Sequence, residues 1–173
     1  NGCESTRTAV TVTVNATPPA PSASAQTFCS AEAKKVGDLN PSGASFKWYN
    51  AATNGTLYAG NETLATGTYY VSQTANGCES TRTAVIVTVN ATPSAPTLSA
   101  ITQPTCSVTL GSFTISDYNS AYAYKITPSS GVTQTGNTVT APKGTYTISA
   151  SVSSCSSGDV NFVINSILCG LQL

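Results

Sequence analysis

The sequence predicts an all-β protein made of tandem β-sandwich domains. Three observations lead to this prediction. Residues 1–18 and 76–93 are identical at 17 of 18 positions and differ only at Thr11 and Ile86, which sets a period of 75 residues. Short stretches in which apolar and polar residues alternate are separated by turn residues. Six cysteines follow a spacing in which long and short steps alternate.

Residues 8–15 show the alternation most clearly. Val10, Val12 and Val14 share one face and threonines share the other, which predicts a half-buried antiparallel strand. The same strand recurs near the end of the next copy, so we interpret residues 1–16 as the terminal strand of a preceding, truncated repeat. The chain is then a part of a longer array.

The first complete domain is expected over residues 17–92, between two proline-rich linkers, ATPPAP and ATPSAP. Trp48 and Tyr69 are candidates for its structural core, the tryptophan against an inter-sheet disulfide and the tyrosine at a corner. Their alternative role is to stack on sugar rings. Turn signals such as Asn76-Gly77 separate strands expected at 33–39, 44–50, 56–59, 67–74 and 82–90.

The second, divergent domain is expected over residues 93–168, followed by a tail at 169–173. Tyr146, a third core candidate, opens an alternating apolar face, and a second such face includes Phe162. No segment has helical apolar spacing over a useful length. The earlier strands are expected at 111–116, 122–127 and 137–141.

The cysteine spacing predicts one disulfide in each domain. Cys29 and Cys78 are 49 residues apart, as are Cys106 and Cys155, so we expect these two pairs. A loop of this length stabilises a domain by about 4 kcal/mol in the chain-entropy model. Disulfides indicate an oxidising, extracellular setting. Cys3 is the copy of Cys78, with its partner expected in the preceding repeat, and Cys169 has no assigned partner.

Composition disfavours several function classes. Charged residues make up 8% of the chain, seven basic and seven acidic, which predicts no nucleic-acid partner. With no histidine and no C-x-x-C, neither a zinc site nor a Ser–His or Cys–His catalytic pair is expected. We therefore predict no enzyme, metal or cofactor, although isolated calcium at a domain junction stays open. No apolar run reaches the roughly 20 residues of a membrane helix, so the chain is not expected to be membrane-embedded.

One candidate ligand surface stands out. Tyr118, Tyr122 and Tyr124 crowd the start of a strand beside Asn119. Aromatic rings beside an amide can stack on a sugar and hydrogen-bond to it. The alternative is that these tyrosines belong to the core and the strand edge.

The first domain contains, in order, Phe28-Cys29, Lys47-Trp48-Tyr49, Leu57, 66–71, 77–80 and Arg82. In these residues it resembles the immunoglobulin-like repeats of secreted Bacteroidetes proteins. The second domain, with Gln103-Pro104-Thr105-Cys106, 144–146 and Cys155, is similar to repeats of very large gliding-motility adhesins of that group (SprB-like). The resemblance implies tandem Ig-like domains, export by the type IX route and display at the cell surface.

Three functions fit these observations. The first is a stalk module of a cell-surface adhesin, whose partners are its neighbouring Ig-like repeats and whose array meets surface polysaccharide or other cells. The second is a spacer in a secreted polysaccharide-degrading enzyme. The third is a filament subunit in which the strand at 8–15 completes a sheet of another chain.

Overall fold

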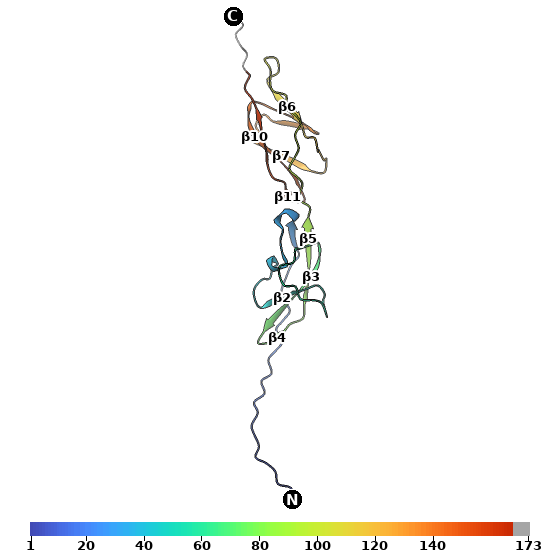
Figure 1. Ribbon diagram of the computed structural model, residues 1–173, viewed down its shortest axis with the longest axis vertical. Helices are drawn as coiled ribbons and strands as arrows, with labels where there is room; N and C mark the ends of the chain where they lie inside the picture. Colours follow the sequence, from blue (N-terminus) through green and yellow to red (C-terminus); the bar gives the residue numbers. More distant parts are fainter. Residues whose placement is uncertain (168–173) are drawn as a thin grey trace. The chain divides into compact units, whose positions relative to one another are not determined.

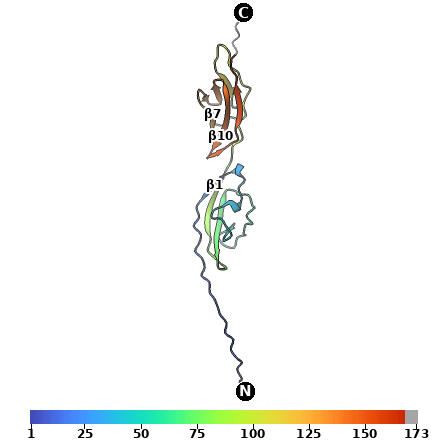
Figure 2. The ribbon, with the colours of Figure 1, turned by 90° about the vertical axis from the view of Figure 1, so that its left-hand side faces the viewer.

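The computed structural model describes residues 1–167, which form two compact units. The first unit comprises Asn1–Phe28 and Ala33–Val89, and the second comprises Cys29–Glu32 and the chain from Asn90 onward. All regular elements other than two short 3₁₀ helices are strands (Figures 1 and 2). The prediction of an all-β protein is confirmed.

One five-stranded sheet organises the first unit. Its order is β1-β5-β3-β2, with β4 paired to β3. In the register of the antiparallel pairs, Tyr69 of β3 faces Val85 of β5, and Trp48 of β2 faces Val71 of β3. The strands are β1 (Gln26–Cys29), β2 (Phe46–Tyr49), β3 (Gly67–Ala75), β4 (Cys78–Glu79) and β5 (Thr83–Asn90).

The second layer of this unit is irregular. Its core combines sheet residues with Val36, Leu39 and Leu64, which come from the segment between β1 and β3. The strand predicted at 33–39 is wrong: η2 (Val36–Asp38) takes three of its seven residues, after η1 (Ser30–Glu32), and the other four belong to no strand. The Asp38 carboxylate accepts a hydrogen bond from the Lys35 backbone N–H at 2.8 Å and so closes a tight turn instead of an extended strand. The strand predicted at 56–59 is reduced to one bridge, between Tyr49 and Leu57.

The leading segment does not form the strand predicted at 8–15. Residues 1–25 contain no strand, and the segment runs as an irregular chain (Figure 2). Val12 is 79% exposed, whereas its copy Val87 is 0% exposed. The copy is buried because β5 lies between β1 and β3, and no described segment flanks residues 8–15 in that way. A strand without neighbours has neither ladder hydrogen bonds nor a core to cover.

The second unit is a sandwich of two sheets. In one sheet β10 is the central strand and pairs with β12 along its first part, with β7 along its second part and with β11 at its end. The second sheet has the order β6-β9-β8. The sequence missed β8, because its three residues are polar and exposed and carry no apolar signal. The strands are β6 (Gly111–Thr114), β7 (Ala123–Thr127), β8 (Thr133–Thr135), β9 (Thr138–Ala141), β10 (Gly144–Val152), β11 (Cys155–Ser156) and β12 (Val160–Ile164).

The core of the second unit lies between its two sheets. Phe113 of β6 meets Phe162 of β12 edge to face, with ring centroids 4.7 Å apart, and Tyr146 of β10 stacks on Phe162 at 5.1 Å. Offset and edge-to-face aromatic pairs contribute beyond their buried area. Fully buried aliphatic residues, Ile115, Val139, Ile148 and Ile164 among them, complete the core.

Candidate functional site

The structure corrects the predicted cysteine pairing. Cys29 is bonded to Cys155, with their Cα atoms 5.6 Å apart, and not to Cys78. Cys78 is a free, half-buried thiol, and Cys3 is a free, exposed one. Cys106 is disulfide-bonded, but not to Cys155 as predicted. The bond at Cys29 thus joins residues that the sequence assigned to two different repeats.

The positions of the strand ends explain this correction. Cys29 ends β1 and is followed by residues that hydrogen-bond to Thr92, just beyond the far end of β5. Cys78 follows the hairpin turn at the end of β3 and lies five residues before Thr83, the first residue of β5. β5 has eight residues and is therefore about 25 Å long. A disulfide needs Cα atoms within about 7 Å, so Cys29 and Cys78, at opposite ends of β5, are too far apart to bond.

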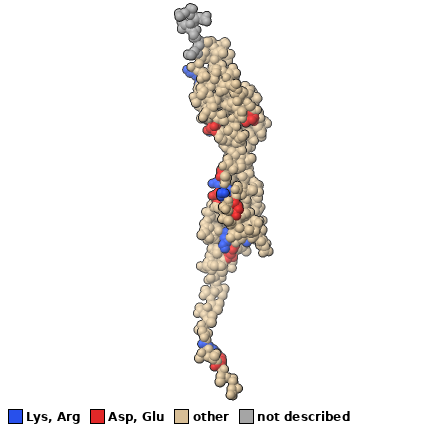
Figure 3. Space-filling view, in the orientation of Figure 1, with Lys and Arg blue, Asp and Glu red and all other residues tan. Residues whose placement is uncertain are grey.

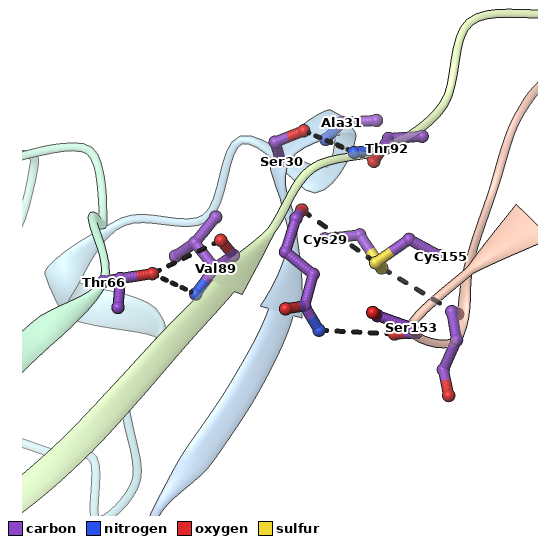
Figure 4. The surroundings of a disulfide bond; sticks show 10 residues. Cys29, Ser30, Ala31, Thr66, Val89, Thr92, Ser153 and Cys155 are labelled. Carbon is purple, nitrogen blue, oxygen red and sulfur yellow. Dashed lines mark hydrogen bonds between the residues drawn. A yellow bond between two sulfur atoms is a disulfide. The ribbon is translucent and has the colours of Figure 1, made fainter. Parts of the chain in front are cut away.

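The surroundings of Cys29–Cys155 form a compact cluster within the second unit, which we call the cysteine joint: residues 29–31, 90–92 and 153–155 (Figure 4). Two hydrogen bonds connect its first two segments. The Thr92 N–H donates to the Ser30 hydroxyl at 2.9 Å, and the Ala31 N–H donates to the Thr92 hydroxyl at 3.1 Å. The Asn90 side-chain amide donates to the Ser153 carbonyl at 3.3 Å.

A tight hairpin presents Cys155 to the joint. Val152 pairs with Cys155, so Ser153 and Ser154 form a two-residue turn, and both have positive φ, 49° and 66°. Such turns match the twist of the flanking strands, and Asn-Gly is their preferred sequence. The first unit has that preferred sequence at the equivalent place, where Asn76 and Gly77 have φ of 49° and 79° and precede Cys78.

The polar residues of the joint were not predicted from the sequence. Neither Asn15 nor Asn90 was assigned a structural role, whereas the structure uses the Asn90 amide as a hydrogen-bond donor. Their place in the repeated N-A-T-P string was the signal, because both copies keep the asparagine directly before the proline-rich linker.

The three predicted core aromatics are buried. Trp48 is 7% exposed and lies in the core of the first unit, although no disulfide packs on it there. Tyr69 and Tyr146 occupy matching positions in the two units. The Tyr69 hydroxyl donates to the Ala65 carbonyl at 3.2 Å, and the Tyr146 hydroxyl donates to the Pro142 carbonyl at 2.9 Å. Each tyrosine therefore ties its strand to the residue four positions earlier, as at a tyrosine corner.

The tyrosines proposed as a ligand surface lie together in the second unit. Tyr118 stacks on Tyr124 with centroids 5.5 Å apart, and the Asn119 N–H donates to the Tyr124 hydroxyl at 2.9 Å. Tyr122 and Tyr124 line a hollow of about 170 Å³ with Asp117 and Asn119. The hydroxyl of Tyr124 and the Oδ1 of Asn119 are already engaged by backbone N–H groups of the same loop. The hollow is small, and these two acceptors in its lining already have partners.

A polar cluster around β4 contains an acid whose pKa is lowered, Glu79. The Glu79 carboxylate accepts a hydrogen bond from the buried Ser72 hydroxyl at 2.6 Å and lies 3.4 Å from the Lys47 ammonium. The Ser72 hydrogen bond is the main reason that the pKa of Glu79 is lowered. Burial, reinforced by Glu79, raises the pKa of Tyr49, and the Arg82 guanidinium stacks 3.4 Å above the Tyr49 ring.

Charged side chains are few and scattered on the face shown in Figure 3. Within residues 1–167, no three His, Cys, Asp or Glu side chains gather in a group that could hold a metal ion. None of the helices in that range has the length and apolar character needed to cross a membrane.

One comparison, with models of known protein families, identifies the fold of the first domain. Residues 18–91 match the family model described as "Ig-like domain CHU_C associated", so this stretch is an immunoglobulin-like domain. No curated protein matches the chain. A disulfide-bearing Ig-like domain is typical of secreted or extracellular proteins.

Three solved structures with some likeness to the chain are each 14% identical to it. A chain of the crystal structure of the mouse coronavirus receptor-binding domain complexed with its murine receptor has a TM-score of 0.35, and the match covers 69% of this chain and 84% of that one. Murine CEACAM1b has a TM-score of 0.34, and the match covers 83% of this chain and 96% of that one. The mouse nectin-like molecule 4 ectodomain has a TM-score of 0.31, and the match covers 78% of this chain and 58% of that one.

Proposed function

We propose that the chain is a structural repeat module, a stalk, of an extracellular bacterial cell-surface adhesin that holds a binding tip away from the cell. The repeat carries this proposal: residues 1–18 recur as 76–93 with one difference, and 76–91 closes the Ig-like domain matched at 18–91. Tandem copies of one small domain add length to a protein without adding a new site. The module itself needs to bind only its neighbours.

The chemistry of the described residues supports a non-catalytic role. The chain has no histidine, and its seven acids are spread along it. The two groups with depressed carboxyl pKa values have structural partners: Glu79 accepts from Ser72, and Glu62 accepts from the backbone N–H groups of Ala59 and Gly60. These carboxylates stabilise a strand pair and a loop.

The cysteine joint supports a mechanical role. A covalent bond between Cys29 and Cys155 cannot be separated by pulling forces that would strip non-covalent contacts, and hydrogen bonds at Ser30, Thr92 and Asn90 surround it. The residue resemblance to gliding-motility adhesins adds the finer proposal that the array is exported by the type IX route and serves surface attachment or gliding.

The parent reading frame tests the stalk function. We expect further cysteine-spaced Ig-like repeats and a secretion signal, with no catalytic domain in the same frame. A hydrolase domain there would overturn the proposal in favour of a spacer in a secreted polysaccharide-degrading enzyme.

Binding by the purified chain is the second test. We expect no binding to bacterial cells or to a glycan array above the background of an unrelated Ig-like domain. Binding that is lost in Tyr122→Ala but kept in Thr135→Ala, a control on the exposed strand β8, would make the tyrosine hollow a sugar site and overturn the purely structural role.

A filament subunit is the second candidate, and the exposed leading segment favours it. Val10, Val12 and Val14 are 81%, 79% and 90% exposed, although their copies cover a core. Such a segment could add as a strand to another chain. Light scattering over a range of chain concentrations tests this. If the chain assembles through the segment, the mean mass of the particles should rise with concentration, and Val12→Asp should abolish that rise.

A further inference from the structure

The first unit contains a second, half-built copy of the cysteine joint. Asn15 and Asn90 are repeat equivalents, and each donates its side-chain amide to the first residue of a two-residue hairpin turn. The Asn15 amide donates to the Asn76 carbonyl at 2.8 Å, and the Asn90 amide donates to the Ser153 carbonyl at 3.3 Å.

The cysteines that follow these turns also occupy matching positions. The Cys78 sulfur lies 3.7 Å from the Asn15 carbonyl oxygen, and the Cys155 sulfur lies 4.0 Å from the Asn90 carbonyl oxygen. Both cysteines are the first residue after a turn with two positive φ values. The joint therefore recurs in its asparagine, its hairpin and its cysteine.

The two copies differ in a single component. At Cys155 the sulfur is bonded to Cys29, the last residue of β1, a strand that lies beside β5. At Cys78 the sulfur is a free, half-buried thiol. The segment that corresponds to β5 there is residues 8–15, and within the described chain no β1-like strand lies beside it.

We propose that Cys78 is the acceptor of a disulfide from a preceding Ig-like repeat, whose donor is the cysteine that ends a β1-type Gln-Thr-Phe-Cys strand laid beside residues 8–15. Each repeat would then be bonded to the next one rather than within itself. This inference deepens the proposed stalk function and rests on it, since it requires an array of such repeats.

The chemistry of the bond needs an oxidant. Two thiols lose two protons and two electrons when the Cys78 and donor sulfurs join, and a disulfide such as oxidised glutathione accepts the electrons and becomes two thiols. The donor thiolate attacks oxidised glutathione and releases one glutathione thiolate. The Cys78 thiolate then attacks the mixed disulfide, forms the protein bond and releases the second glutathione thiolate.

The repeat supplies its own test chain. Residue 76 is the equivalent of residue 1, so a second copy of residues 17–75 placed directly before Asn1 continues the array in register around the complete chain. The added copy brings one donor, its own Cys29. Two cysteines of the original chain then compete as acceptors. Cys3 lies 49 residues after it, at the spacing of an intra-repeat pair, and Cys78 lies one repeat further on.

The experiment is unreduced peptide mapping after oxidation with glutathione and alkylation with iodoacetamide. In the 173-residue chain we expect Cys78 to be alkylated and Cys29 to be bonded to Cys155. In the extended chain we expect the alkylation of Cys78 to be lost and a peptide linking Cys78 to the added Cys29 to appear. Cys29→Ser in the added copy alone should restore the alkylation, and Cys3→Ser should leave the new bond intact.

Other outcomes overturn the inference and separate it from the stalk proposal. A bond between the added Cys29 and Cys3 would show pairing within a repeat, which refutes the inference and leaves the stalk standing. A Cys78 that is alkylated in the extended chain, or that links two chains on a non-reducing gel, also refutes it. An added copy that contributes no β-sheet circular dichroism would refute the array, and the stalk function with it.

Discussion

At the scale of single residues, the repeat supplies matched pairs whose chemical identity is the same and whose surroundings differ. Glu79 accepts from a fully buried serine hydroxyl, whereas its copy Glu4 contacts only Arg7 in an exposed ion pair. The difference in environment, and not in residue type, determines what each carboxylate contributes.

Glu79→Gln should destabilise the first unit by about 1–2 kcal/mol at pH 7, because the Ser72 hydroxyl loses its charged acceptor. The pKa of Glu79 is lowered from 4.5 in the folded state, so its stabilising effect is complete above about pH 4.5 and is lost as the pH falls through the lowered pKa. Urea unfolding at pH 7 and at pH 3 measures the loss of stability and its dependence on pH. The matched control Glu4→Gln should change little at either pH, and an equal loss in both variants would contradict the assignment.

Gly111→Ala should destabilise the second unit by about 1–3 kcal/mol through overpacking. A Cβ at position 111 would lie 2.7 Å from the Cδ1 and 2.8 Å from the Cγ2 of Ile164, a fully buried side chain. Thermal unfolding followed by circular dichroism measures the effect. Gly158→Ala is the control, since its added Cβ meets no atom within 4 Å; a loss at both positions would indicate a backbone effect instead.

At the scale of elements, two nearly identical segments of this chain have different structures. Residues 83–90 and 8–15 differ only at Ile86 and Thr11, yet one copy is the strand β5 and the other is an exposed segment. Alternation supplies a strand with an apolar face, but a neighbouring strand must provide the hydrogen bonds and a core must cover the face.

Val87→Ala should cost about 2 kcal/mol, because it removes two methyl groups from a fully buried site and leaves a cavity. The same substitution at the equivalent Val12 should cost almost nothing, since that side chain is 79% exposed. Parallel denaturant titrations of the two variants compare them directly. A comparable loss at Val12 would mean that residues 8–15 are packed in solution.

At the scale of the whole molecule, the Cys29–Cys155 bond joins residues that are 126 positions apart in sequence. The chain-entropy model assigns about 4–5 kcal/mol to a loop of this size. Cys29→Ser should therefore lower the unfolding midpoint of the second unit markedly, as should a reductant. Cys78→Ser is the matched control and should leave the midpoint of the 173-residue chain nearly unchanged, because that thiol is free. An equal fall of the unfolding midpoint in the two variants would contradict the bond between Cys29 and Cys155.

Local pattern was enough to predict the fold class and most of the strands. Alternating residues predicted β5, β10 and β12, and the turn residues Asn76-Gly77 marked the end of β3. The predicted core aromatics Trp48, Tyr69 and Tyr146 all lie in buried positions. Patterns of this kind are visible in a sequence because backbone geometry sends successive side chains of a strand to opposite faces.

The sequence by itself determined the all-β class, the 75-residue period and the buried faces of β5, β10 and β12. Only the tertiary structure decided which cysteines meet, because a disulfide depends on which strand ends lie within a few ångströms and an equal spacing of 49 residues does not report that distance. The tertiary structure also left residues 8–15 without a sheet, because a strand forms only where its neighbours are present.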